Sequence, residues 1–136
     1  MPDKALSCLK KAVEAESLSS SSTLEVRTEH AGTLLNMCAI QSQMGNHSDA
    51  IKAAKQALSL LENSTVDDDS SRDESYHLMR LAGWYNLGIE QDHEHHYGQA
   101  VTSLQKGLSS EAKMTLGDSH PLVMKTRQAL SKIERK

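Results

Sequence analysis

Hydrophobic residues recur at intervals of three and four positions along most of this chain, and short polar or glycine-containing stretches separate the recurrences. In the first segment, Ala5, Leu9 and Ala12 fall on one face of a helix, which is the spacing of a helix with one buried side. The pattern predicts six helices and no strand. These helices span residues 3–16, 23–44, 47–62, 72–92, 97–114 and 121–135.

Capping residues mark several of the predicted helix ends. Ser22 and Ser71 each stand three positions before a glutamate, so serine oxygen and carboxylate can each accept a backbone N–H of the other's residue. Gly45 predicts the end of the second helix, because glycine adopts the left-handed conformation of a helix cap. Pro121 predicts the start of the last helix, where its missing N–H costs little. The polar, acidic segment 63–71 predicts a solvated loop.

Two stretches of the chain align with each other at a spacing of 50 residues. The matching positions are Leu34, Met37, Cys38 and Ala50 in the first stretch and Trp84, Leu87, Gly88 and Ala100 in the second. The second stretch opens with Trp-x2-Leu-Gly and continues with a small residue that allows the following helix to pack closely. This arrangement resembles the tetratricopeptide repeat.

A second likeness lies in the segment 116–123, Leu-Gly-Asp-Ser-His-Pro-Leu-Val, which is similar to the connector of kinesin-light-chain-type arrays of these repeats. The resemblance implies an all-α fold, a right-handed α-solenoid of tetratricopeptide helix hairpins. Gln41 and Gln91 depart from the family, which usually has tyrosine or another large residue there. The implied single domain, 1–136, comprises a half repeat (1–18), two repeats (22–63 and 71–115) and a capping helix (119–136). Its expected core is Leu9, Leu34, Cys38, Ala50, Ala54, Leu58, Trp84, Leu87, Gly88, Ala100 and Leu104.

The resemblance also implies a binding groove. Asn36 and Asn86 occupy the same repeat position, and in the family an asparagine there faces the groove, where its amide grips an extended peptide backbone. The neighbouring apolar walls would be Leu35, Ala39, Tyr85 and Ile89. We therefore expect a non-catalytic scaffold that binds a peptide or protein partner. Two alternatives stay open: solvated or capping asparagines, and a purely architectural segment that self-associates through its end helices.

Composition excludes several other classes of function. A formal net charge of −3 without a basic stripe argues against nucleic-acid binding, and no apolar run approaches the length of a membrane span. The first four residues, Met-Pro-Asp-Lys, begin no secretory signal, so we expect a cytoplasmic protein. Cys8 and Cys38 lie in apolar helical patterns, which favours small buried thiols over a disulfide. No catalytic motif or cofactor-binding motif is present.

A run of polar residues, Asp92-His93-Glu94-His95-His96, offers the most reactive chemistry in the chain. Imidazoles and carboxylates bind zinc or copper, so a metal-responsive or pH-sensing module at His93–His96 is a further alternative. Consecutive turn residues cannot all point at one ion, however. The favoured interpretation is a polar turn between two helices, with no metal bound, and His47 occupies the equivalent turn of the first repeat.

Overall fold

The computed structural model describes residues 2–17, 24–62, 74–109 and 115–135. Within these residues the chain forms six helices and no strand, as the hydrophobic pattern predicts. The helices are α1 (Pro2–Ser17), α2 (Leu24–Gln43), α3 (His47–Glu62), α4 (Glu74–His93), α5 (Tyr97–Gly107) and α7 (Pro121–Glu134). The all-α class is therefore confirmed for the part of the chain that the structure describes. None of these helices combines the length and the apolarity that crossing a membrane requires.

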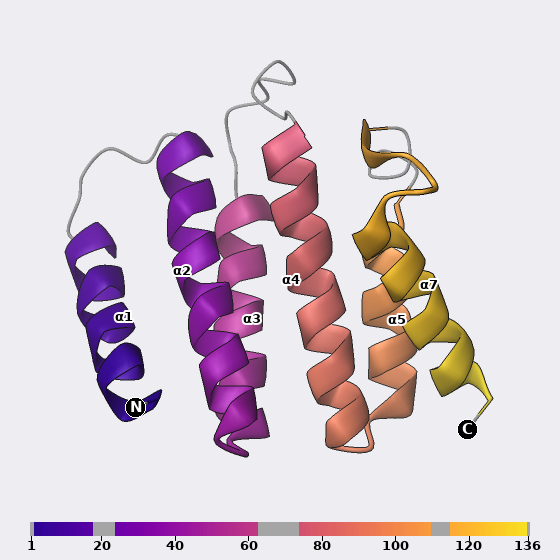
Figure 1. The fold of residues 1–136 in the computed structure, drawn as a ribbon, viewed down its shortest axis with the longest axis horizontal. Coiled ribbons are helices and arrows are strands. Elements are labelled where there is room, and N and C mark those ends of the chain that lie inside the picture. Colours follow the sequence, from indigo (N-terminus) through magenta and orange to yellow (C-terminus); the bar gives the residue numbers. More distant parts are fainter. Residues whose placement is uncertain (1, 18–23, 63–73, 110–114, 136) are drawn as a thin grey trace.

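The helices follow one another across the molecule in the order of the chain, but not in a single row, because α2 also packs against α4 and α4 against α7 (Figure 1). Helices α2 and α3 pack against each other as one hairpin, and α4 and α5 form a second. The hairpins meet where α4 packs on both α2 and α3, and α7 covers α5 and part of α4. Helix α4 is therefore the central element, in contact with four neighbours.

The two hairpins turn with the same backbone hydrogen bonds. In the first turn the N–H of Gly45 donates to the carbonyl of Ser42 at 3.0 Å, and in the second the N–H of His95 donates to Asp92 at 2.9 Å. The other bonds join Met44 to Ile40, Asn46 to Gln41 and Ala50 to Asn46 in the first turn, and Glu94 to Glu90, His96 to Gln91 and Ala100 to His96 in the second. Every bond recurs 50 residues later, so the offset seen in the sequence is also the offset of the backbone.

The left-handed residue of each turn differs between the hairpins. Gly45 has a φ of 82° and ends α2 as its sequence predicts, whereas His95 holds the equivalent position with a φ of 63°. A side chain in this conformation costs roughly 1–2 kcal/mol. His95 Nδ1 shares a hydrogen bond with the Tyr97 hydroxyl at 2.8 Å, and this contact helps to hold the second turn.

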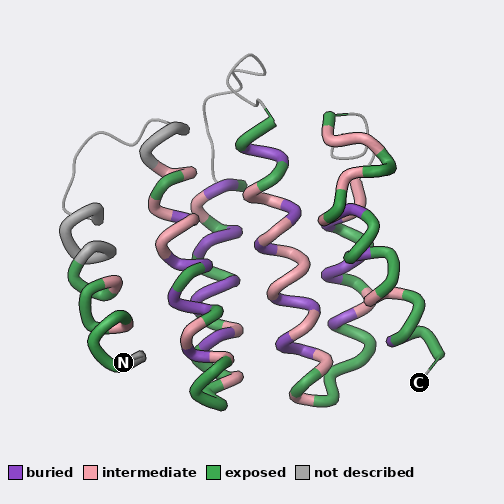
Figure 2. Tube along the Cα trace, in the orientation of Figure 1, coloured by how far each residue is buried: buried purple, intermediate pink, exposed green. Residues whose placement is uncertain are grey.

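The buried residues lie on the helix faces that point toward neighbouring helices (Figure 2). Every predicted core residue is buried except Leu9 and Trp84, which are partly buried and pack against the same cluster. This larger cluster joins α2, α3 and α4, and a smaller one unites Ala100 and Leu104 of α5 with Ile133 of α7. Small residues allow the close approach of α4 and α5: a Cβ at Gly88 would lie only 2.8 Å from Leu104 Cγ.

Three sequence predictions differ from the structure or fall outside it. Helix α5 ends at Gly107 instead of residue 114, because Leu108 leaves the helical conformation (φ −84°, ψ 37°) as the C-cap. Cys8 is exposed, so the expectation of a buried thiol is wrong for this residue. The predicted caps at Ser22 and Ser71 and the loop 63–71 lie outside the described residues.

Two other sequence predictions are confirmed. Cys38 is buried, and this burial together with the charge of Glu90 raises the pKa of its thiol to about 12. The thiol therefore stays protonated and unreactive at neutral pH. Pro121 stands in the first turn of α7, whose N-cap His120 accepts a hydrogen bond from the N–H of Leu122 at 3.1 Å.

Candidate partner-binding surfaces

The two asparagines lie on neighbouring helices, Asn36 in the second half of α2 and Asn86 in the second half of α4. Asn36 is exposed and Asn86 is partly buried. Neither amide makes a hydrogen bond or other polar contact with any described residue. Both residues are inside helices and distant from the helix ends, so neither caps a helix. Their amides are therefore available to a ligand.

The four apolar neighbours named from the sequence are placed differently from one another. Ala39 is exposed and Ile89 is partly buried, so both contribute surface beside the asparagines. Leu35 is only 7% exposed and belongs to the main core cluster, so it offers little wall to a groove. Tyr85 packs against the smaller cluster, and Lys125 Nζ of α7 lies 5.6 Å from the centroid of its ring. We call Asn36, Ala39, Tyr85, Asn86 and Ile89 the asparagine surface.

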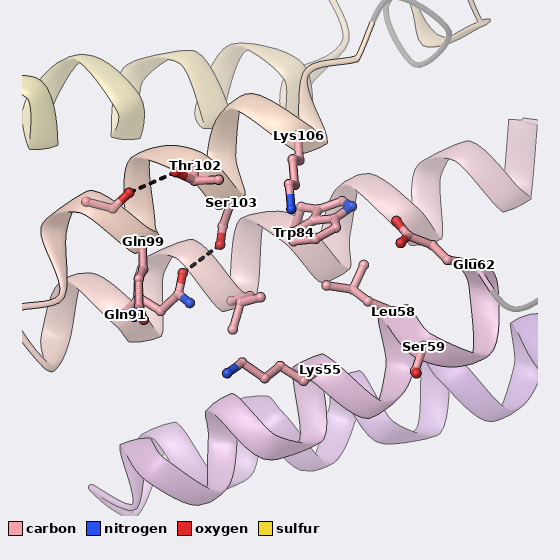
Figure 3. Close-up of a pocket in the computed structure, with 12 residues that line it drawn as sticks. Lys55, Leu58, Ser59, Glu62, Trp84, Gln91, Gln99, Thr102, Ser103 and Lys106 are labelled. Carbon is pink, nitrogen blue, oxygen red and sulfur yellow. Dashed lines mark hydrogen bonds between the residues drawn. The ribbon is translucent and has the colours of Figure 1, made fainter.

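A concave region lies between α3, α4 and α5, away from the asparagine surface (Figure 3). Its volume is about 490 Å³, and none of the residues named from the sequence as a binding site lines it. We call it the α3–α5 groove. The side chains that define it are Lys55 and Leu58 of α3, Trp84, Leu87 and Gln91 of α4, and Lys106 of α5.

Positive charge surrounds the Trp84 ring in this groove. Lys106 Nζ lies 5.2 Å from the ring centroid and the Arg80 guanidinium carbon lies 6.0 Å from it, distances at which cations attract an aromatic face. Arg80 also approaches the Glu62 carboxylate at 3.5 Å and donates to the carbonyl of Lys106 at 3.2 Å. These contacts hold the indole in place, while its buried Nε1 has no hydrogen-bond partner among the described residues.

A buried hydrogen bond at the edge of the groove occurs in one hairpin only. The Ser103 hydroxyl donates to Gln91 Oε1 at 2.6 Å, and both residues are buried. Fifty residues earlier, Gln41 is also buried, but the position equivalent to Ser103 is Ala53, which has no hydroxyl. Gln41 Oε1 has no hydrogen-bond partner in the described structure. The first hairpin thus keeps the acceptor and lacks the donor.

Restoring that donor should stabilise the protein. We expect Ala53→Ser to raise the free energy of unfolding by about 0.5–1.5 kcal/mol, the net value of one buried hydrogen bond, as measured by urea denaturation. Ala57→Ser is the matched control, because Ala57 is equally buried but its position has no counterpart of the Ser103–Gln91 bond. A loss of stability with Ala53→Ser, equal to that with Ala57→Ser, would show that the two hairpins do not share this register.

Four of the seven histidines, His47, His93, His95 and His96, lie at the turn end of the hairpins, and their described contacts are not those of a metal site. His47 of α3 donates from Nδ1 to the Glu90 carboxylate at 2.6 Å, and its ring stacks on that of His93 with centroids 4.7 Å apart. His95 bonds Tyr97 instead. Among the described residues, no three His, Cys, Asp or Glu side chains are arranged to hold a metal ion. The run His93–His96 is therefore divided between separate contacts.

The chain matches no family model, no curated protein and no solved structure. All five residues of the asparagine surface were predicted from the sequence, and so was Leu35, which is buried instead. The sequence analysis did not predict Lys125 beside Tyr85 or the α3–α5 groove. The one signal for the groove was Trp84, the single tryptophan of the chain.

Proposed function

We propose that this chain is a non-catalytic protein-interaction module of the tetratricopeptide type, acting in the cytoplasm, and that its asparagine surface binds an extended peptide segment of a partner. The observation that carries this proposal is the pair Asn36 and Asn86. Their amides stand at equivalent positions of packed helices, reach solvent, and have no described partner within the chain.

An amide at each of two such positions suits a peptide backbone. Each carboxamide can donate one hydrogen bond and accept another, which matches the N–H and C=O of an extended chain. Such bonds grip a peptide without reading its side chains, while apolar neighbours such as Ala39 and Ile89 supply contact area. The partner class is therefore a segment that presents a free backbone edge.

The helix arrangement supports the repeat type. Each hairpin joins its helices through the same turn, and the backbone hydrogen bonds recur at an offset of 50 residues. The tight crossing of α4 and α5 uses Gly88 and Ala100, small residues at the positions where the repeat pattern requires them. We also propose that the hairpins stack as a right-handed solenoid.

Binding should weaken when either amide is removed. We expect Asn36→Ala and Asn86→Ala each to weaken peptide binding by about 2- to 10-fold, the effect of one or more neutral hydrogen bonds. The measurement is binding to an array of short synthetic peptides of varied sequence, followed by titration of the peptides that bind. Circular dichroism should show unchanged helicity in both variants, since neither amide makes a hydrogen bond or other polar contact with a described residue.

Lys52→Ala provides the matched control, because Lys52 is exposed on α3 and lies outside both surfaces. Binding that this variant weakens as much as the asparagine variants would contradict the proposal. If no peptide binds and light scattering shows a stable dimer, the architectural, self-associating alternative replaces it.

A further inference from the structure

Helices α3 and α5 form the two sides of the α3–α5 groove, and α4 forms its base. Helices α3 and α5 both pack against α4, while few contacts join them to each other. The side chains of Trp84 and Gln91 project from α4 between them (Figure 3), and Leu87 of α4 also lines the groove. These three residues are spaced by three and four positions, so they share one face of α4. Asn86 and Ile89 fall on the opposite face, which separates the groove from the asparagine surface.

The groove carries two lysines without carboxylate partners. Lys55 extends from α3 and Lys106 from α5, so the two ammonium groups come from opposite walls. Neither lysine forms an ion pair with any described residue, and Lys106 contacts only the Trp84 ring through its charge. The acidic residue of the lining, Glu62, lies 3.5 Å from Arg80. The charge left unbalanced in the groove is therefore positive.

Hydrogen-bonding groups and apolar surface complete the lining. The oxygen of the Gln91 amide is occupied by Ser103 at 2.6 Å, and its nitrogen points into the groove in Figure 3. That nitrogen is a donor, as are the two ammonium groups. Leu58, Leu87 and the Trp84 ring supply apolar surface between them. The volume of about 490 Å³ falls in the range of roughly 300–1,000 Å³ that is usual for pockets that enclose a ligand.

We propose that the α3–α5 groove is a second binding site, and that it takes an acidic peptide segment with one apolar side chain flanked by carboxylates. The apolar side chain lies against Trp84 and Leu87, and the carboxylates pair with Lys55 and Lys106. A peptide backbone carbonyl accepts from the Gln91 amide. This site acts independently of the asparagine surface, because the two occupy opposite faces of α4.

The single tryptophan of the chain makes this site directly observable. Trp84 lines the groove, so its emission reports a ligand that reaches it. The probe is a fluorescein-labelled peptide of alternating glutamate and leucine, and the matched probe replaces each glutamate by glutamine. We expect the acidic probe to shift Trp84 emission saturably and the glutamine probe to bind more weakly. Added salt should weaken the acidic probe as well, because exposed charge pairs are screened.

Substitution of each lysine tests whether Lys55 and Lys106 bind the acidic probe. We expect Lys55→Ala and Lys106→Ala each to weaken the acidic probe by about 2- to 5-fold, the usual effect of an exposed charge pair, and the double variant by more than either alone. Affinity is read from the anisotropy of the probe, since removing Lys106 also changes the surroundings of Trp84. Lys52→Ala should leave the affinity for the acidic probe unchanged. The double variant Asn36→Ala, Asn86→Ala should also leave it unchanged.

Three results would overturn the proposal. The first is the absence of any saturable change in anisotropy or in Trp84 emission. The second is a lack of charge selectivity. It would appear as equal affinity for the acidic and glutamine probes, or as a loss of affinity with Lys52→Ala equal to that with Lys55→Ala or Lys106→Ala. The third is loss of the acidic probe in the Asn36→Ala, Asn86→Ala double variant, which would place the peptide on the asparagine surface instead. Failure of the asparagine surface to bind any peptide leaves these measurements unaffected, so the two sites are tested separately.

Discussion

Replacing Ile133 by alanine should lower the free energy of unfolding by about 2–5 kcal/mol, the usual cost of emptying a buried aliphatic site. Ile133 is 4% exposed and packs with Ala100 and Leu104, so it fixes α7 over the second hairpin. Its loss removes transfer free energy and leaves a cavity between α5 and α7. Urea denaturation followed by circular dichroism measures the effect.

The control for this substitution lies on the same helix. Met124 is 48% exposed, so Met124→Ala should change stability by no more than about 0.5 kcal/mol. Equal effects from the two variants would mean that α7 does not cover the core through Ile133. Helix α7 would then be a loosely attached extension.

Replacing Ala100 by leucine should cost about 1–3 kcal/mol through overpacking. Ala100 is fully buried where α4 and α5 cross, and a Cβ at Gly88 would already lie 3.3 Å from the Ala100 carbonyl oxygen. The extra carbons of leucine have no space there, so the two helices must separate or the side chain must leave its preferred rotamer. Thermal unfolding should begin at a lower temperature.

Gln105→Leu tests whether this effect belongs to the crossing. Gln105 is exposed on the same helix, so leucine there adds a similar side chain without intruding on α4. Unchanged stability of Ala100→Leu would place the crossing at another residue and would refute the alignment of Ala50 with Ala100.

The helices were predictable because local sequence determines them. The range 47–62 predicted from periodicity is the range of α3, and Gly45 and Pro121 mark helix ends through their own backbone preferences. The end of α5 was not predictable in this way. Leu108 continues the apolar spacing of α5, yet the helix stops at the buried Gly107, where a Cβ would lie 2.9 Å from Trp84 Cβ.

The two candidate surfaces were predicted less completely than the helices, because they depend on contacts between distant segments. Asn36 and Asn86 were found by their register, which a repeat displays in the sequence. The partial covering of Tyr85 depends on where α7 packs, and Lys125 reaches its ring from 40 positions further along the chain. In the sequence, Lys55 and Lys106 look like ordinary exposed lysines on the polar faces of two helices. Only the packing of α3 and α5 on either side of α4 brings them to one groove.

The hydrogen bond between His47 and Glu90 joins different hairpins, and this bears on how the molecule unfolds. Glu90 belongs to α4 and its side chain is 5% exposed, while its partner His47 begins α3. When units contact only their neighbours, stability is the sum of unit terms and interface terms, and strong interface terms make the units unfold together. A buried carboxylate satisfied across the boundary strengthens the interface term, since it has this partner only while both hairpins are docked. The bond therefore favours a single cooperative transition over the stepwise loss of one hairpin and then the other.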